Sequence, residues 1–146
     1  MQIRVEIDQE CKETEVIIRA AELTEEIHET IQKLSVSQQK LLAGFTNDGV
    51  ELLDASEVIR FYAENKKVYA QTARREFLVR LRLYELEERL DKHMFARISN
   101  SEIINLKEVR KIDLSFSGTI CITLSNRQTV YVSRRFLVKI KEFLGI

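Results

Sequence analysis

The stretch FARISNSEIINLKEVRKI, residues 95–112, decides the fold predicted for this chain. Three polar residues, Ser99, Asn100 and Ser101, interrupt it between two apolar runs that have the character of β-strands. The pattern predicts a loop presented by two strands. The Asn100 amide offers one acceptor and two donors, a set that can pair with the major-groove edge of adenine. An ordinary polar turn is the alternative, because Asn and Ser favour turns on their own.

Length and composition predict one domain of ordinary size with an additional segment. The chain has 146 residues, and 45% of them are hydrophobic, which is enough to bury a core. The two cysteines, Cys11 and Cys121, lack the spacing of a metal site or a disulfide framework, and no signal peptide or membrane span is evident. We therefore expect a reduced cytoplasmic protein with no metal or other cofactor.

The charges are distributed unevenly, although the net charge is zero. Residues 1–39 carry four basic side chains against nine acidic ones, whereas residues 40–146 carry nineteen against fourteen. A basic domain next to an acidic segment is typical of proteins that bind nucleic acid, and it also occurs in unrelated domains.

The first 37 residues predict a small acidic arm made of two strands and a helix. Residues 2–8 alternate apolar and polar side chains with the period of a half-buried strand, and residues 15–20 form a second short run. From Leu23 onward the apolar residues follow helical spacing, with one apolar stripe. That stripe needs a partner, either the chain's own domain or a second copy, so we assign residues 1–37 to dimerisation or regulation.

The remainder, residues 40–146, predicts a β-dominated, antiparallel α+β domain with short helices. Runs rich in Val, Ile, Tyr and Phe alternate with polar turns. Amphipathic helices are expected at 82–91 and after Ser133, which has the character of an N-cap. The expected strands are 40–45, 50–53, 58–63, 67–72, 77–81, 95–98, 103–114, 119–124 and 129–132.

Two pairs of adjacent cations are candidates for binding an anion. Lys66 and Lys67 fall at the tip of an expected hairpin, where they are placed for a phosphate backbone or are simply solvated. Arg134 and Arg135 fall in the first turn of the final helix, where the helix dipole disfavours cations by about 0.3–1 kcal/mol each. A phosphate at that helix start, or a guanine edge, would explain them, and an exposed Arg pair without a ligand is the alternative.

Three segments resemble LytTR-type DNA-binding domains, and they occur in that family's order. The segment FARISNSEIINLKEV resembles the string F-x-R, x-x-S, x-I-x-N-L that leads into a strand. The segment TVYVSRRFLVKIKEFL resembles the closing strand, Ser-x-Arg corner and final helix, and LLDASEVIRFYAENKKVYAQT resembles the opening strands and first hairpin. The resemblance covers roughly residues 40–146, so the arm lies outside it.

The resemblance implies a stand-alone transcriptional regulator rather than an enzyme, with double-stranded DNA and no small molecule as its ligand. Loops would enter two successive major grooves of bent DNA, and a homodimer would occupy tandem sites. Many members carry a receiver domain in front, and about 40 residues are too few to form one. A membrane protein is therefore the kind of regulatory partner that the resemblance suggests.

Individual roles follow from the positions that match the family. We expect base contacts from Lys67, Asn100 and Arg135. We expect phosphate contacts from Lys66, Ser101 and Arg134. Many members have a His or Arg where this chain has Lys67, and a basic residue where it has Asn100, so the loop positions carry over better than the base preference.

A β-rich module that binds protein or single-stranded nucleic acid is the alternative function. Such a module would display aromatic side chains on a strand face, on which bases stack. Tyr62, Tyr69 and Tyr131 could form this platform, although each also fits as core packing.

Overall fold

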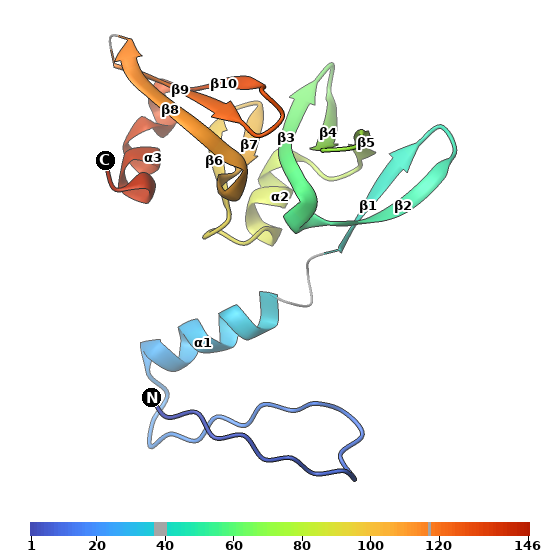
Figure 1. Cartoon of the computed structure of the whole chain (residues 1–146), viewed down its shortest axis with the longest axis vertical. Helices are drawn as coiled ribbons and strands as arrows, with labels where there is room; N and C mark the ends of the chain where they lie inside the picture. The colour runs from blue at the N-terminus through green and yellow to red at the C-terminus, as the bar shows by residue number, and fades with distance from the viewer. Residues whose placement is uncertain (37–40, 117) are drawn as a thin grey trace. The chain divides into compact units, whose positions relative to one another are not determined.

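The computed structural model describes residues 1–36, 41–116 and 118–146. The chain divides into two compact units, Met1–Leu34 and Ser35–Ile146. The larger unit consists of two antiparallel sheets with short helices (Figure 1), which confirms the predicted β-dominated α+β class. None of the helices in the described ranges is long and apolar enough to cross a membrane.

A seven-stranded antiparallel sheet, in the order β2-β1-β5-β4-β3-β7-β6, forms the larger part of this unit. Its strands are β1 (Leu41–Thr46), β2 (Gly49–Asp54), β3 (Val58–Glu64), β4 (Lys67–Thr72), β5 (Glu76–Val79), β6 (Phe95–Ser99) and β7 (Glu102–Asn105). Phe61 of β3 lies opposite Ile103 of β7. This pairing places the β6–β7 hairpin beside the β3–β4 hairpin, although 22 residues, 73–94, separate them in sequence.

A three-stranded antiparallel sheet, in the order β10-β9-β8, forms the rest of the unit. Its strands are β8 (Val109–Phe116), β9 (Thr119–Leu124) and β10 (Thr129–Val132). The helices of the unit are α2 (Leu83–Arg89), which lies between β5 and β6 in sequence, and the final α3 (Leu137–Leu144). The predicted helices at 82–91 and after Ser133 are thereby confirmed.

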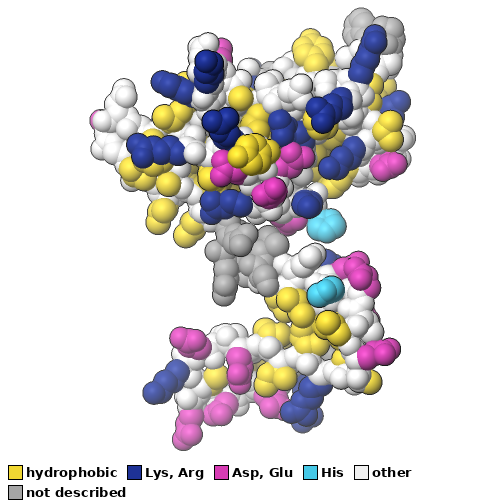
Figure 2. Space-filling model, turned by 180° about the vertical axis from the view of Figure 1, so that it is seen from behind, with side chains coloured by type: hydrophobic (Ala, Val, Ile, Leu, Met, Phe, Trp, Pro, Cys, Tyr) yellow, Lys and Arg dark blue, Asp and Glu magenta, His cyan; other side chains and the backbone are white. Residues whose placement is uncertain are grey.

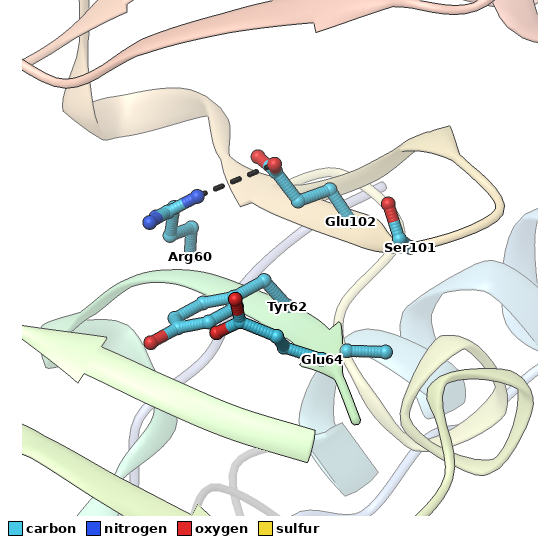
Figure 3. A pocket seen from close by; sticks show the side chains of 6 residues that line it. Arg60, Tyr62, Glu64, Ser101 and Glu102 are labelled. Atoms are coloured by element: carbon cyan, nitrogen blue, oxygen red, sulfur yellow. Dashed lines mark ion pairs between the residues drawn. The ribbon is translucent and has the colours of Figure 1, made fainter. Parts of the chain in front are cut away.

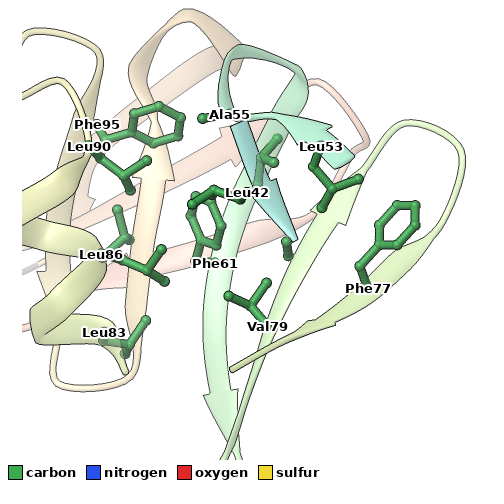
Figure 4. Close-up of a cluster of buried hydrophobic side chains, with 13 residues drawn as sticks. Leu42, Leu53, Ala55, Phe61, Phe77, Val79, Leu83, Leu86, Leu90 and Phe95 are labelled. Atoms are coloured by element: carbon green, nitrogen blue, oxygen red, sulfur yellow. The ribbon is translucent and has the colours of Figure 1, made fainter. Parts of the chain in front are cut away.

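Two clusters of buried hydrophobic side chains stabilise the unit, and β6 contributes to both. In the first cluster, Phe61 and Leu86 lie between the large sheet and α2 (Figure 4). The second cluster joins the small sheet to α3, through residues such as Ile122 and Ile140. Phe95 of β6 belongs to the first cluster and Ile98 to the second. The loop that follows β6 therefore starts from a strand that is held on both sides.

The long strand predicted at 103–114 is interrupted. A single turn of 3₁₀ helix, η2 (Leu106–Glu108), separates β7 from β8. The turn begins at Asn105, a fully buried side chain with 0% exposure. The amide oxygen of Asn105 accepts a hydrogen bond from the Lys107 N–H at 3.0 Å. Apolar patterning alone does not reveal this break, because the residues on both sides of the turn fit a strand.

The Asn105 amide also ties two distant parts of the unit together. Its Nδ2 donates to the carbonyl oxygens of Val58 at 2.9 Å and Ser56 at 3.2 Å. Ser56 lies in the connection between β2 and β3, which contains a matching 3₁₀ turn, η1 (Ala55–Glu57), and Val58 is the first residue of β3. That turn is capped by Asp54, whose carboxylate accepts from the Ser56 N–H at 2.9 Å.

The arm contains the expected helix, α1 (Glu25–Val36), but not the two expected strands. The structure assigns no strand to residues 2–8 or 15–20, and a turn in which the Cys11 N–H donates to the Asp8 carbonyl lies between them. The apolar side chains of the first segment are 75% to 88% exposed. A two-stranded ribbon with no covered face is at best marginally stable in water, which explains why alternation alone predicts too much here.

A candidate nucleic-acid interface

The β3–β4 hairpin ends in a tight turn that displays two lysines. Asn65 and Lys66 have positive φ angles of 51° and 63°, and Glu64 pairs with Lys67 across the turn. Two central residues with positive φ match the twist of an antiparallel hairpin, and Asn tolerates this conformation well. Lys66 and Lys67 are both exposed, so their ammonium groups extend from the tip into solvent.

The β6–β7 connection is the predicted loop, and it is organised by its two serines. The Ser101 N–H donates to the Ser99 hydroxyl at 3.2 Å, and the two hydroxyl oxygens lie 3.3 Å apart. Asn100, at the tip, is exposed. Within the described part of the chain its side-chain amide makes no hydrogen bond. The amide is therefore free to bind an external group.

The corner after β10 differs in detail from the sequence-based expectation. Arg134 and Arg135 lie in a turn of 3₁₀ helix, η3 (Arg134–Phe136), and the α-helix begins only at Leu137. Ser133 occupies the N-cap position, as predicted, but its side chain makes no capping hydrogen bond. Both arginines are exposed, and neither forms an ion pair among the residues that the structure describes.

Two main-chain hydrogen bonds join these three segments. The Ala63 N–H, near the β3–β4 tip, donates to the Ser101 carbonyl at 2.8 Å. On the other side of the same loop, the Ser133 N–H donates to the Ile98 carbonyl at 2.8 Å. The middle loop is thus fixed to the hairpin on one side and to the corner on the other. We name the result the three-loop surface, formed by Lys66, Lys67, Asn100, Ser101, Arg134 and Arg135.

The distribution of charge agrees with the sequence. Lys and Arg side chains are spread over the face of the larger unit that Figure 2 shows. On the three-loop surface itself, four of the six side chains are cationic and none is acidic. The surface is therefore chemically suited to a polyanion that also carries hydrogen-bonding groups.

A small polar pocket of about 310 Å³ lies next to this surface (Figure 3). Arg60, Tyr62, Ala63, Glu64, Ser101 and Glu102 line it. The Arg60 Nη1 lies 3.3 Å from the Glu102 Oε1. Burial raises the pKa of the Glu102 carboxyl, and the neighbouring Arg60 acts in the opposite direction. The carboxylate and guanidinium therefore offset each other's charge inside the pocket.

The tyrosines do not form one stacking platform. The rings of Tyr62 and Tyr69 stack on each other with centroids 5.3 Å apart, and the Arg60 guanidinium covers Tyr62 at 4.3 Å. Burial and a hydrogen bond to Glu76 raise the pKa of Tyr62 to about 12, so its hydroxyl stays a donor at neutral pH. Tyr131 is exposed but belongs to β10 in the other sheet. The arrangement gives little support to single-strand binding by stacking.

Two residues with structural roles at the site were not identified from the sequence. Arg97 and Asn105 are both contained in the quoted stretch, but their importance depends on partners elsewhere in the fold. Asn105 is a polar residue in an otherwise apolar run, and it is also the Asn of the x-I-x-N-L string. Arg97 carries a signal only as the Arg of the F-x-R string.

These features define a β-dominated nucleic-acid-binding domain that presents loops, and the comparisons identify its family. A family model described as the LytTr DNA-binding domain matches residues 48–145. The chain belongs to this family, which confirms the resemblance seen in the sequence. A solved LytTr DNA-binding domain from Bacillus cereus has the same fold, with a TM-score of 0.70 and 25% identity, over 73% of this chain and 98% of that chain.

Relatives in Staphylococcus aureus are similar over the arm as well. An HTH-type transcriptional regulator from strain MRSA252, named as uncharacterized, is 35% identical over 147 residues, covering 100% of this chain and 99% of the relative. Another such regulator, from strain MSSA476, is 37% identical over 139 residues, covering 93% of this chain and 94% of the relative. The arm is thus shared with these relatives, whereas the family model does not include it.

Proposed function

We propose that this protein is a cytoplasmic transcriptional regulator that binds double-stranded DNA sequence-specifically through the three-loop surface. Its membership of the LytTr DNA-binding family and the printed names of its staphylococcal relatives support the regulatory role. The observation that carries the proposal is the pair of main-chain hydrogen bonds that holds three loops together as one surface.

The chemistry of each side chain suggests a division of roles. The free amide of Asn100 and the guanidinium of Arg135 can each make two hydrogen bonds to one base, and Lys67 can donate to guanine. Lys66, Arg134 and Ser101 are suited to phosphate oxygens. Loops rather than a recognition helix would enter successive major grooves, because no two α-helices follow each other directly in the ranges that the structure describes.

We further propose that the protein binds tandem sites as a homodimer and that the arm mediates dimerisation or contact with a regulatory protein, for which a membrane protein is a candidate. The support is the apolar surface of the arm. Ile31 on α1 is 42% exposed, and Leu23 is 71% exposed. An amphipathic helix gains stability when a partner covers its apolar stripe.

DNA binding is expected to weaken steeply as salt concentration rises. Each phosphate contact should contribute about 0.9 to the slope of log affinity against log salt. Fluorescence anisotropy with a labelled duplex at several salt concentrations measures this slope, and Lys66→Ala and Arg134→Ala should each reduce it by about 0.9. Lys111→Ala, an exposed lysine on β8 outside the three loops, is the matched control. A slope near zero for the unmodified protein would contradict binding through phosphates.

Deletion of the arm is expected to affect paired sites more than single sites. A protein that lacks residues 1–34 retains the three-loop surface, so its affinity for a single site should stay within about twofold. On a duplex with two sites, the loss of linkage should weaken binding by about tenfold or more. Titration of both duplexes with both proteins makes the comparison. An equal loss on the two duplexes would show that the arm acts on the domain or on DNA instead.

A further inference from the structure

Arg97 lies in β6, immediately before the middle loop, but its side chain is only 14% exposed. Its Nε donates to the Ser99 carbonyl at 2.8 Å, and its Nη2 donates to the Asn100 carbonyl at 2.8 Å. The guanidinium therefore binds two successive carbonyl oxygens of the loop that presents Asn100.

The third nitrogen of Arg97 binds a side chain outside the loop. Its Nη1 lies 2.9 Å from the Glu87 carboxylate, which belongs to α2. That helix is fixed in the core by Leu83 and Leu86, which are 6% and 0% exposed. The ion pair therefore connects the loop to a helix that is anchored in the core, and each of the three guanidinium nitrogens already has a partner within the fold.

The β6–β7 hairpin needs such support because its register is irregular at this point. The pairing shifts between Arg97 and Ser99, so the regular ladder of the two strands is broken just before the loop. A bulge redirects the following side chain but leaves main-chain groups without ladder partners. Arg97 supplies the donors for the two carbonyls that flank the α-carbon of Asn100, those of Ser99 and of Asn100 itself.

We propose that Arg97 is a positioning residue for DNA recognition, which rests on the function proposed above. It fixes the loop conformation from which the Asn100 amide reaches a base, and it does so without touching DNA. Arginine is required for this role, since a lysine ammonium is a point charge that cannot bind two carbonyls and a carboxylate in one plane.

The test compares Arg97→Lys, which keeps the charge, with Arg97→Met, which removes it. The probes are a duplex that the unmodified protein selects from a randomised pool and a random duplex of equal length. Both variants are expected to lose about tenfold or more in affinity for the selected duplex, with little loss on the random one and an unchanged salt slope. If Arg97→Lys binds like the unmodified protein, and Arg97→Met weakens both duplexes equally with a shallower slope, Arg97 is a phosphate contact and the proposal is overturned.

Two further variants separate positioning from stability. Glu87→Gln removes the charge of the partner on α2, and it should reduce the preference for the selected duplex in the same direction, by a smaller factor. Arg110→Lys is the matched control, because Arg110 also donates to main-chain carbonyls, those of Lys107 and Val109, outside the three-loop surface. It should leave the preference unchanged. Thermal unfolding by circular dichroism confirms that each protein is folded at the assay temperature.

Nuclear magnetic resonance relaxation of the free protein tests the positioning role of Arg97 without DNA. Its result therefore does not depend on the proposed function. The amides of Asn100 and Ser101 should become more mobile in Arg97→Lys than in the unmodified protein, and Arg110→Lys should not change them. Unchanged mobility would overturn the positioning role. If the unmodified protein selects no duplex, the proposed function fails, and the mobility of these two amides still decides the role of Arg97.

Discussion

Arg135→Ala and Asn100→Ala proteins are expected to bind the preferred duplex about 1–3 kcal/mol more weakly, which corresponds to a loss of about 5- to 150-fold. The expected loss on random duplexes is much smaller, because bidentate contacts discriminate among bases and contribute little to nonspecific binding. The structure places both side chains in solvent on segments that main-chain hydrogen bonds hold to each other. Isothermal titration or anisotropy with the two duplexes gives the two affinities.

The loss of affinity in Asn100→Ala must be distinguished from a change in the conformation of the β6–β7 loop. The Asn100 side chain makes no hydrogen bond within the described residues, so Asn100→Ala should leave the thermal midpoint almost unchanged. Lys111→Ala again serves as the exposed control, with no expected change in preference. Folded variants that lose affinity equally for preferred and random duplexes would show that these positions do not read bases.

Asn105→Ala is expected to lower the free energy of unfolding by about 2–4 kcal/mol, the largest effect on stability that we predict. The substitution removes a buried hydrogen bond to the Val58 carbonyl and two part-buried ones, to the Ser56 carbonyl and from the Lys107 N–H. An unsatisfied buried group costs about 1–3 kcal/mol, and the part-buried groups cost less because water can reach them. Asn105→Asp should also be destabilising, because a carboxylate keeps the acceptor but cannot donate to two carbonyls. Denaturant unfolding followed by circular dichroism measures the change.

Asn126→Ala provides the matched control for this experiment. Asn126 also makes two hydrogen bonds, to Gln71 at 2.9 Å and from the Gln128 N–H at 3.1 Å, but it is exposed. Water can replace its partners, so the expected loss is about 0.5–1 kcal/mol. If Asn105→Ala costs no more than Asn126→Ala, the buried amide does not stabilise the connection between β2 and β3.

Local sequence patterns predict most of the elements but not what connects them. The strands expected at 67–72 and 129–132 agree with β4 and β10, because alternating apolar residues and flanking turn residues are sufficient to define a hairpin strand. The break at Asn105 was missed, since the residues on both sides of it fit a strand and the carbonyls that its Nδ2 binds lie almost 50 residues earlier in the chain. The two strands of the arm were predicted wrongly. Alternation of apolar and polar residues is a local property of the sequence, whereas a stable strand also needs a paired strand and a covered face.

For the candidate site too, the sequence predicts the individual loops but not the contacts that join them. The tips that carry Lys66, Lys67 and Asn100 were predicted from turn chemistry, and the structure confirms that they are exposed loop tips. Their roles towards bases and phosphates stay predictions. The 3₁₀ geometry around Arg134 could not be read from the sequence, because helical spacing does not distinguish a first turn of 3₁₀ helix from one of α-helix. The convergence of the three loops depends on two hydrogen bonds between residues more than 30 positions apart.

Because main-chain groups make both of those joints, the side chains at positions 67, 100 and 135 can be exchanged without loosening the joints. If these three side chains contact bases as proposed, a lineage acquires a new operator by changing a few exposed residues while every buried residue stays the same. Under the same proposal, two regulators with this scaffold control different genes in one cell after very few mutations. For protein engineering, a library randomised at those three positions tests this directly, with little risk of unfolded variants.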